Sequence, residues 1–88
     1  MSEVEAGEPR VLLIGRRGCH LCDEARDVVR RVTAEQGTSF AEVDVDTDEE
    51  LRRAYSDQVP VVMVDGKQHD FWRVDEQRLR AALAGQGR

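Results

Sequence analysis

The chain has 88 residues, and its 18 acidic and 13 basic side chains give a net charge of −5. This length suits one small domain with a modest core, and the acidic balance excludes nucleic acid as the main partner. No apolar run approaches the ~20 residues of a membrane span, and the acidic start lacks the apolar segment of a signal peptide. We therefore expect a cytoplasmic, monomeric protein that binds neither nucleic acid nor a membrane.

The first part of the chain predicts a loose tail, a strand and a helix. Residues 1–9 show no periodicity and end at a proline, which predicts a disordered tail. Residues 10–14 hold a short apolar run, typical of a central strand that is covered on both faces. A loop follows at residues 15–18. Apolar residues then recur at spacings of three and four and predict a helix that ends at Gly37, namely Leu21, Ala25, Val28, Val29 and Val32.

A second strand and a short helix are predicted next. Residues 40–45 alternate apolar and polar side chains between turn formers, which indicates a strand. Thr47 and Glu50 fit a capping box, in which Thr47 accepts a hydrogen bond from a free amide at the helix start while Glu50 reaches back. The apolar face of this helix is expected to consist of Leu51, Ala54 and Tyr55.

The last third of the chain predicts a hairpin and a closing helix. Residues 59–64 read as an apolar strand, and the pair Asp65-Gly66 predicts a tight turn into a fourth strand at residues 67–73. Asp75 is a good N-cap for the closing helix. This helix is expected to present Leu79, Ala82 and Leu83 and to stop at Gly85.

The element order is therefore βαβαββα. A parallel first half needs a helical crossover, whereas the hairpin makes the last pair of strands antiparallel. We expect an α/β fold, with a mixed four-stranded sheet and helices on both faces, over residues 10–84. A short tail is expected at residues 85–88.

The segment Cys19-His20-Leu21-Cys22 contains the only two cysteines of the chain, at the junction of the first strand and the first helix. Its spacing places both thiols on one helical turn, close enough to form a small reversible disulfide. A helix N-terminus favours the thiolate of Cys19, whereas Cys22 lies one turn deeper and should be more buried. We predict that Cys19 attacks a disulfide and that Cys22 resolves the mixed disulfide.

Charged neighbours are expected to modulate this nucleophile. Arg16 and Arg17 precede the motif, and a guanidinium within about 4 to 6 Å of a thiol favours the thiolate. His20 would add a third positive charge near neutral pH. The alternative for all three residues is an exposed position with no role in the chemistry.

These residues make the chain resemble the glutaredoxin branch of the thioredoxin-like superfamily, over residues 10–84. The Cys-x-x-Cys sequence follows the first strand, and Val59-Pro60 with Val62 and Gly66 matches the Val-Pro-x-Val segment of that family and its following turn. The most similar group is bacterial and has a Gly-Cys-His-Leu-Cys-Asp core. The resemblance implies a thioredoxin-like fold of the glutaredoxin type and a disulfide oxidoreductase whose redox-active disulfide lies within the motif.

The resemblance also implies roles for residues around the cysteines. It implies a cis peptide bond before Pro60, which would place the backbone of Val59 beside Cys19 to pair with an extended substrate. Arg16 stands three residues before Cys19, where many glutaredoxins carry a lysine that contacts a carboxylate of glutathione.

Other positions depart from the family pattern. Gln58 stands where a threonine is common, and Asp70 and Phe71 replace a Gly-Gly pair after the fourth strand. Glycines let backbone amides approach glutathione closely, whereas Asp70 would repel its carboxylates and Phe71 would add bulk. We expect no bound cofactor, a disulfide-containing protein or a low-molecular-weight thiol as substrate, and either glutathione or a flavoprotein reductase as electron donor.

Two further functions stay open on the residues alone. One is metal binding: Cys19 and Cys22 could bind zinc with His20 or His69, or two chains could share an iron-sulfur cluster. Structural zinc takes four ligands, which argues against a zinc site within one chain. The third possibility is a thioredoxin-like interaction module without turnover. Strand alternation and helix capping explain most of the acidic run at residues 42–50, so we expect no metal site there.

The aromatic residues near the end of the fourth strand have two interpretations as well. Phe71 and Trp72 are expected to close the edge of the core, and a landing site for a protein substrate is the alternative. His69 is expected to be an exposed strand residue.

Overall fold

The computed structural model describes residues 9–85, so most of both predicted tails lies outside the described residues. The strands and helices follow the predicted order, with one additional 3₁₀ helix, η1. Their bounds are β1 Val11–Gly15, α2 His20–Gln36, β2 Phe40–Asp44, η1 Val45–Thr47, α3 Glu49–Tyr55, β3 Val61–Val64, β4 Lys67–Phe71 and α4 Glu76–Gly85.

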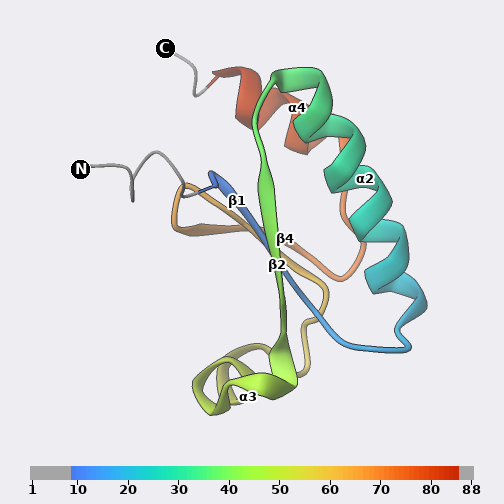
Figure 1. Ribbon diagram of the computed structural model, residues 1–88, viewed down its shortest axis with the longest axis vertical. Helices are drawn as coiled ribbons and strands as arrows, with labels where there is room; N and C mark the ends of the chain where they lie inside the picture. The colour runs from blue at the N-terminus through green and yellow to red at the C-terminus, as the bar shows by residue number, and fades with distance from the viewer. Residues whose placement is uncertain (1–8, 86–88) are drawn as a thin grey trace.

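The sheet is mixed and four-stranded, in the order β2-β1-β3-β4 (Figure 1). β1 and β2 are parallel and are joined by α2, whereas β3 runs antiparallel to both β1 and β4. Asp65 and Gly66 form the hairpin turn with φ values of 52° and 84°, as the Asp-Gly signal predicts. The predicted parallel crossover and terminal hairpin are both confirmed.

Helices cover both faces of the sheet. Figure 1 shows α2 and α4 packed side by side on one face, with α3 near one end of the sheet on the other. Successive side chains of β1 point to opposite faces, because strands have a period of two. Val11 and Leu13 therefore pack against α2 and α4, and Ile14 packs toward α3.

The larger core lies under α2 and α4. Its fully or nearly buried side chains come from β1, β3 and the two helices, and they are Val11, Leu13, Ala25, Val29, Val32, Val62, Val64, Leu79 and Leu83. The predicted apolar faces of both helices account for most of this set. The smaller core contains Ile14, Val45 and Val61, against which Leu51 and Tyr55 of α3 are partly buried.

The predicted cap of α3 is wrong. Asp48, not Thr47, caps this helix, and its Oδ1 accepts the amides of Glu50 and Leu51 at 2.8 and 3.2 Å. The Thr47 hydroxyl instead donates to the carbonyl of Asp44 at 2.7 Å, within η1. The extra turn of η1 takes Thr47 out of the capping position. Ala54, predicted on the apolar face, is exposed.

The two strands of the hairpin are shorter than predicted. β3 begins at Val61, after the Val59-Pro60 pair, and β4 ends at Phe71 rather than at residue 73. The φ of Trp72 is 69°, which is left-handed and incompatible with an extended strand. The strand therefore stops at the residue before it.

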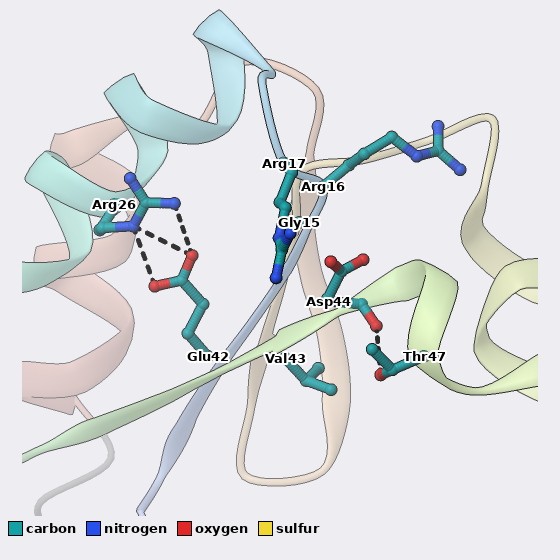
Figure 2. Close-up of a pocket in the computed structure, with 8 residues that line it drawn as sticks. All are labelled: Gly15, Arg16, Arg17, Arg26, Glu42, Val43, Asp44 and Thr47. Atoms are coloured by element: carbon teal, nitrogen blue, oxygen red, sulfur yellow. Dashed lines mark hydrogen bonds and ion pairs between the residues drawn. The ribbon is translucent and has the colours of Figure 1, made fainter.

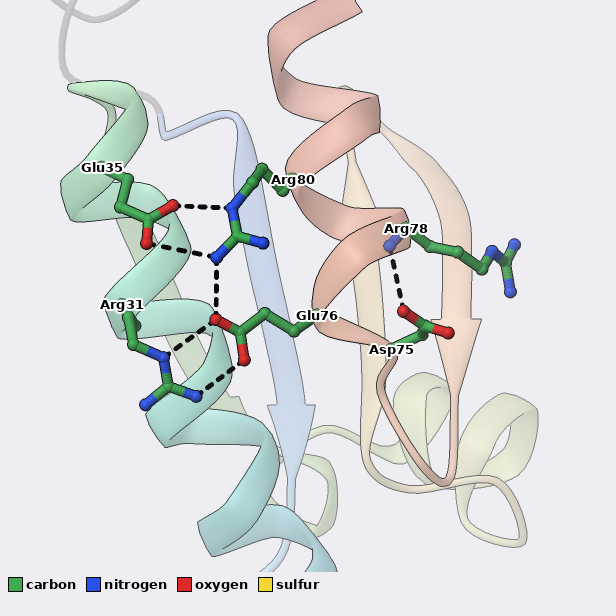
Figure 3. A network of polar contacts seen from close by, with 6 residues as sticks. All are labelled: Arg31, Glu35, Asp75, Glu76, Arg78 and Arg80. Carbon is green, nitrogen blue, oxygen red and sulfur yellow. Dashed lines mark hydrogen bonds and ion pairs between the residues drawn. The ribbon is translucent and has the colours of Figure 1, made fainter.

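Ion pairs connect α2 with α4 (Figure 3). The carboxylate of Glu76 accepts two hydrogen bonds from Arg31, at 2.9 and 3.0 Å, and one from Arg80 at 2.9 Å. Arg80 also donates to both oxygens of Glu35, at 2.8 and 3.2 Å. Four charges thus alternate in sign across the contact between the two helices.

Replacing Glu76 by glutamine is expected to lower the melting temperature at pH 7, more so at low salt, because the network loses its central negative charge. The hydrogen bond from Arg31 holds the pKa of Glu76 below its ordinary value of 4.5. Its contribution is therefore present above pH 4.5 and disappears as the pH falls below that value. Thermal unfolding at pH 7 and pH 3 measures this, and the two proteins should melt more alike at pH 3.

The matched control is Glu49→Gln on α3, which removes an exposed pair with Arg53. Such isolated pairs contribute little, so this variant should melt nearly as the wild type does. A Glu76→Gln deficit of equal size at both pH values would contradict the electrostatic origin of the effect.

Candidate functional site

The cysteine motif lies at the carboxyl end of β1, where open α/β sheets usually place their chemistry. β1 ends at Gly15, a short loop turns at Gly18 with a φ of 70°, and α2 begins at His20. Cys19 is the N-cap of α2, with extended backbone angles of −104° and 114°. The sequence-based prediction of a strand-to-helix junction at the motif is therefore confirmed.

The two thiols differ in exposure and in bonding. Cys19 is partly exposed, whereas Cys22 is 0% exposed, and both are free thiols. The Sγ of Cys19 accepts a hydrogen bond from the backbone N–H of Cys22 at 3.1 Å. Cys19 is thus the sulfur that a substrate can reach, and Cys22 lies directly behind it.

Burial raises the pKa of the Cys22 thiol to about 12, and the neighbouring Cys19 side chain raises it as well. The backbone N–H of Arg16 partly offsets this increase. A thiol with this pKa stays protonated at neutral pH, so Cys22 is not a competing nucleophile in the free dithiol.

Gly15 makes room for the buried sulfur. A Cβ atom added to Gly15 would come within 3.3 Å of the Cys22 Sγ, closer than ordinary van der Waals contact. This residue belongs to the site, although the sequence analysis places it only in a loop. Its one sequence signal is its place at the end of a buried strand, just before the motif.

The peptide bond between Val59 and Pro60 is cis, as the resemblance implies. Pro60 is buried, and its carbonyl accepts the backbone N–H of Trp72 at 2.7 Å. Val59 is partly buried against Val61 and its neighbours in the smaller core. Pairing of the Val59 backbone with a substrate stays a prediction.

Arg16 is engaged on the side of η1 and α3. Its guanidinium donates to both oxygens of Asp46, at 2.9 and 3.1 Å, and to the Ser56 hydroxyl at 2.9 Å. Figure 2 shows the side chain extending away from Arg26 and Glu42. A contact of Arg16 with a carboxylate of a bound thiol stays a prediction, and it would compete with Asp46.

His20 and Arg17 are exposed at the start of α2 and in the loop before it. An exposed position is what we expect for both residues if they have no role in the chemistry. A modulating role for His20 stays a prediction.

A polar hollow of about 380 Å³ lies beside the loop that precedes the motif (Figure 2). Three arginines, Arg16, Arg17 and Arg26, contribute positive charge to its lining, and Glu42 and Asp44 contribute negative charge. Arg26 binds Glu42 through three hydrogen bonds of 2.7 to 3.0 Å. Two of the three guanidinium groups are already paired, Arg26 with Glu42 and Arg16 with Asp46.

The acidic run at residues 42–50 is engaged within the protein. Glu42 binds Arg26, Asp46 binds Arg16, and Asp44 and Asp48 cap η1 and α3. Within residues 9–85 no three His, Cys, Asp or Glu side chains lie close enough together to hold a metal ion. No helix in the described part of the chain is long and apolar enough to cross a membrane.

The expectation that Phe71 and Trp72 close the edge of the core is wrong. Phe71 is 49% exposed and Trp72 is 58% exposed. Phe71 ends β4 and alternates with the buried Asp70, so its side chain is exposed, and the left-handed φ of Trp72 takes the next residue out of the strand. His69, expected to be exposed, is half-buried, and burial lowers its pKa.

Asp70 has a structural position that its sequence context did not reveal. It is 9% exposed, and its carboxylate accepts the backbone amides of Phe71 at 2.9 Å and of Asp75 at 3.0 Å. It therefore closes the loop between β4 and α4, which carries Trp72. The main consequence of aspartate at this position is therefore that its carboxylate accepts hydrogen bonds from the loop, rather than that it repels the carboxylates of glutathione.

Replacing Asp70 by alanine is expected to destabilise the fold by about 1–3 kcal/mol, because two backbone amides lose their acceptor in part-buried hydrogen bonds. Urea unfolding measures the loss. Asp70→Asn, which keeps one carbonyl oxygen, should lose less. Wild-type stability of the alanine variant would show that solvent replaces the carboxylate without cost.

Comparisons with known proteins agree with this geometry. Residues 10–84 match the model of a family described as Glutaredoxin-like domain (DUF836). An uncharacterized protein of Mycobacterium tuberculosis is 37% identical in an alignment of 81 residues, and the match covers 86% of this chain and 84% of that protein. The X-ray structure of a structural-genomics target from X. campestris has a TM-score of 0.71 and 36% identity, and the match covers 85% of this chain and 96% of that one.

A glutaredoxin from Archaeoglobus fulgidus has a TM-score of 0.58 at 21% identity, over 92% of each chain. At this identity the likeness concerns the fold alone. Together with the sheet order, it confirms the expected thioredoxin-like fold of the glutaredoxin type.

Proposed function

Because the chain belongs to the glutaredoxin-like domain family, whose match and fold support a redox-type thiol function, we propose that it is a thiol-disulfide oxidoreductase. Cys19 is the attacking residue and Cys22 the resolving residue. The observation that carries the proposal is the asymmetry of the pair, an accessible sulfur at a helix N-terminus with a fully buried thiol one turn behind it.

The reaction proceeds in two exchange steps. The Cys19 thiolate attacks one sulfur of the substrate disulfide; a bond forms between these sulfurs, the substrate S–S bond breaks, and the other substrate sulfur leaves as a thiolate that takes a proton from solvent. Cys22 then loses its proton and attacks the Cys19 Sγ, which releases the second substrate thiol. Two electrons pass from the cysteine pair to the substrate, and a disulfide joins Cys19 and Cys22.

The order of these steps follows from the pKa of Cys22. In the free dithiol, burial and the Cys19 side chain both raise this pKa. Once Cys19 is in a mixed disulfide it carries no thiolate charge, so it no longer opposes ionisation of the neighbouring Cys22 thiol. Cys22 therefore becomes easier to deprotonate when the resolving step requires it.

Turnover needs a reductant for the disulfide between Cys19 and Cys22. Glutathione and a flavoprotein reductase are the two candidate donors. Arg16, the predicted partner of a glutathione carboxylate, already binds Asp46, and Phe71 stands exposed where glutaredoxins have glycine. These contacts favour the flavoprotein reductase, with a protein or a low-molecular-weight disulfide as substrate.

The test uses bis(2-hydroxyethyl) disulfide as a small substrate. The prereduced protein should release two thiols per molecule, and Cys22→Ser should instead accumulate a mixed disulfide on Cys19, seen by mass spectrometry as an added hydroxyethylthio group. Reduction of the oxidised protein by glutathione and by thioredoxin reductase then identifies the donor. Absence of thiol release from the wild type, with no adduct on Cys22→Ser, would refute the assignment.

A further inference from the structure

Trp72 combines exposure with an uncommon backbone conformation. It is 58% exposed, and Phe71 is the other large apolar residue that stands exposed within residues 9–85. Its φ of 69° lies in the left-handed region, which residues other than glycine rarely adopt. Such a conformation persists only where surrounding contacts hold it, and it is frequent at functional sites.

Hydrogen bonds hold the loop of Trp72 in place. The backbone N–H of Trp72 donates to the Pro60 carbonyl at 2.7 Å, which fixes it beside the cis peptide bond. On either side of it, the amides of Phe71 and Asp75 donate to the carboxylate of Asp70. The position of the indole relative to the redox motif is therefore set by the loop and not by burial of the indole itself.

Trp72 lines a groove that reaches the redox motif. The opposite wall is the first part of α2, with Leu21, the residue between the two cysteines, and Val28; Val74 lies on the side of Trp72. The volume is about 160 Å³, smaller than the roughly 300 Å³ at which small-molecule pockets begin. This size and this lining suit one apolar side chain.

Charged residues frame the groove. Glu24 lines it from α2 and Arg73 lines it from the loop. Neither side chain makes a hydrogen bond or an ion pair with any other described residue, whereas the adjacent Asp23 is paired with Arg26 at 2.8 Å. The Glu24 carboxylate is thus available to a basic side chain of a bound molecule, and the Arg73 guanidinium is available to an acidic group.

We propose that this groove binds the polypeptide that carries the substrate disulfide. It takes an apolar side chain next to the reacting cysteine, stacks it against Trp72, and pairs Glu24 with a basic residue of the same polypeptide. The proposal rests on the proposed function of Cys19 and Cys22, and it names the substrate class as a polypeptide disulfide with an apolar and a basic residue close to its cysteine. Trp72 is then a specificity residue, which explains why a glycine-like backbone position carries an indole.

The test compares two peptides, acetyl-Lys-Leu-Cys-Ala-amide and acetyl-Lys-Ser-Cys-Ala-amide, each with its cysteine in a mixed disulfide with 2-mercaptoethanol. Prereduced protein is used in a single turnover, so the two electrons come from Cys19 and Cys22 and no donor is needed. The wild type should react with the leucine peptide about tenfold faster than with the serine peptide. Trp72→Gly should bring the ratio of the two rate constants close to one.

Two controls separate docking from folding. Glycine accepts a φ of 69° without strain, so Trp72→Gly should melt at or above the wild-type temperature while it loses the preference. Phe71→Ala removes an adjacent exposed aromatic that does not line the groove and should keep the preference.

A direct binding measurement is independent of turnover. Trp72 is the only tryptophan of the chain, so its emission should shift to shorter wavelength when acetyl-Lys-Leu-Ser-Ala-amide is added and burial of the indole increases. Glu24→Gln should weaken this binding. The serine counterpart of the peptide should give a smaller shift.

A ratio near one in the wild type, an unchanged ratio in Trp72→Gly, or an equal loss in Phe71→Ala would each overturn the docking proposal. Reduction of bis(2-hydroxyethyl) disulfide with no preference between the peptides would refute docking alone. No reduction of either peptide or of the small disulfide would refute the proposed function, and docking of a substrate with it.

Discussion

Replacing Cys19 by serine is expected to abolish disulfide reduction, with a loss of at least about a thousandfold in rate. A serine hydroxyl is a far weaker nucleophile than a thiolate at neutral pH, and the remaining thiol at Cys22 is buried with a raised pKa. The measurement is the rate of thiol release from bis(2-hydroxyethyl) disulfide by the prereduced protein.

The fold of this variant should be preserved. Serine is among the best helix N-caps, so its hydroxyl can accept the Cys22 amide that the Cys19 sulfur accepts in the wild type. Thermal unfolding of Cys19→Ser should therefore resemble that of the wild type. Full activity in a folded Cys19→Ser variant would show that Cys19 is not the nucleophile.

Replacing Leu79 by alanine is expected to cost about 2–5 kcal/mol of stability, the usual range for a fully buried leucine. Leu79 is 0% exposed and lies in the larger core with Val29, Val32 and Val62. A small domain has only about 5–15 kcal/mol of net stability, so this single change should remove a large fraction of it. Urea unfolding, with an unchanged m-value, measures the loss.

The matched control lies on the same helix. Gln77→Ala also creates an alanine in α4 but at an exposed position, where substitutions usually stay within about 0.5 kcal/mol. Alanine is a better helix former than glutamine, so a loss at Gln77 comparable to that at Leu79 would show that the deficit at Leu79 does not come from core packing.

The helix ends and the hairpin could be predicted because their signals are local. Gly37 ends α2 with a φ of 69°, and Asp75 accepts the amide of Arg78 at 3.1 Å at the start of α4. The Asp65-Gly66 turn has positive φ at both residues. Each feature depends on residues within one turn of the chain, so a short stretch of sequence contains the whole interaction.

The choice between Thr47 and Asp48 as the cap of α3 could not be made in this way. Both residues are good N-caps, and the decision depends on η1, a turn that Asp44 starts by accepting the amide of Asp46 at 2.8 Å. Because several acidic residues follow one another, several of them could cap the start of a helix. Packing of Val45 into the smaller core selects one of them.

The loop between β4 and α4 could not be predicted because contacts distant in sequence define it. The Pro60 carbonyl binds the Trp72 amide across the hairpin, and Asp70 turns inward to reach Asp75. Apolar pattern alone places Trp72 in a core, since nothing in its neighbours signals a left-handed backbone. The same loop determines the candidate docking groove, so the substrate class could not be inferred from the motif alone.

The low burial of α3 has a consequence for the motions of the molecule. This helix has seven residues and none of them is buried, whereas β1 and α2 hold many of the fully buried side chains of the larger core. Its amides should exchange with solvent deuterium through local opening, at a free energy well below that of global unfolding. The cysteine pair is attached to β1 and α2, so the dithiol keeps its geometry while the opposite face of the sheet opens and closes.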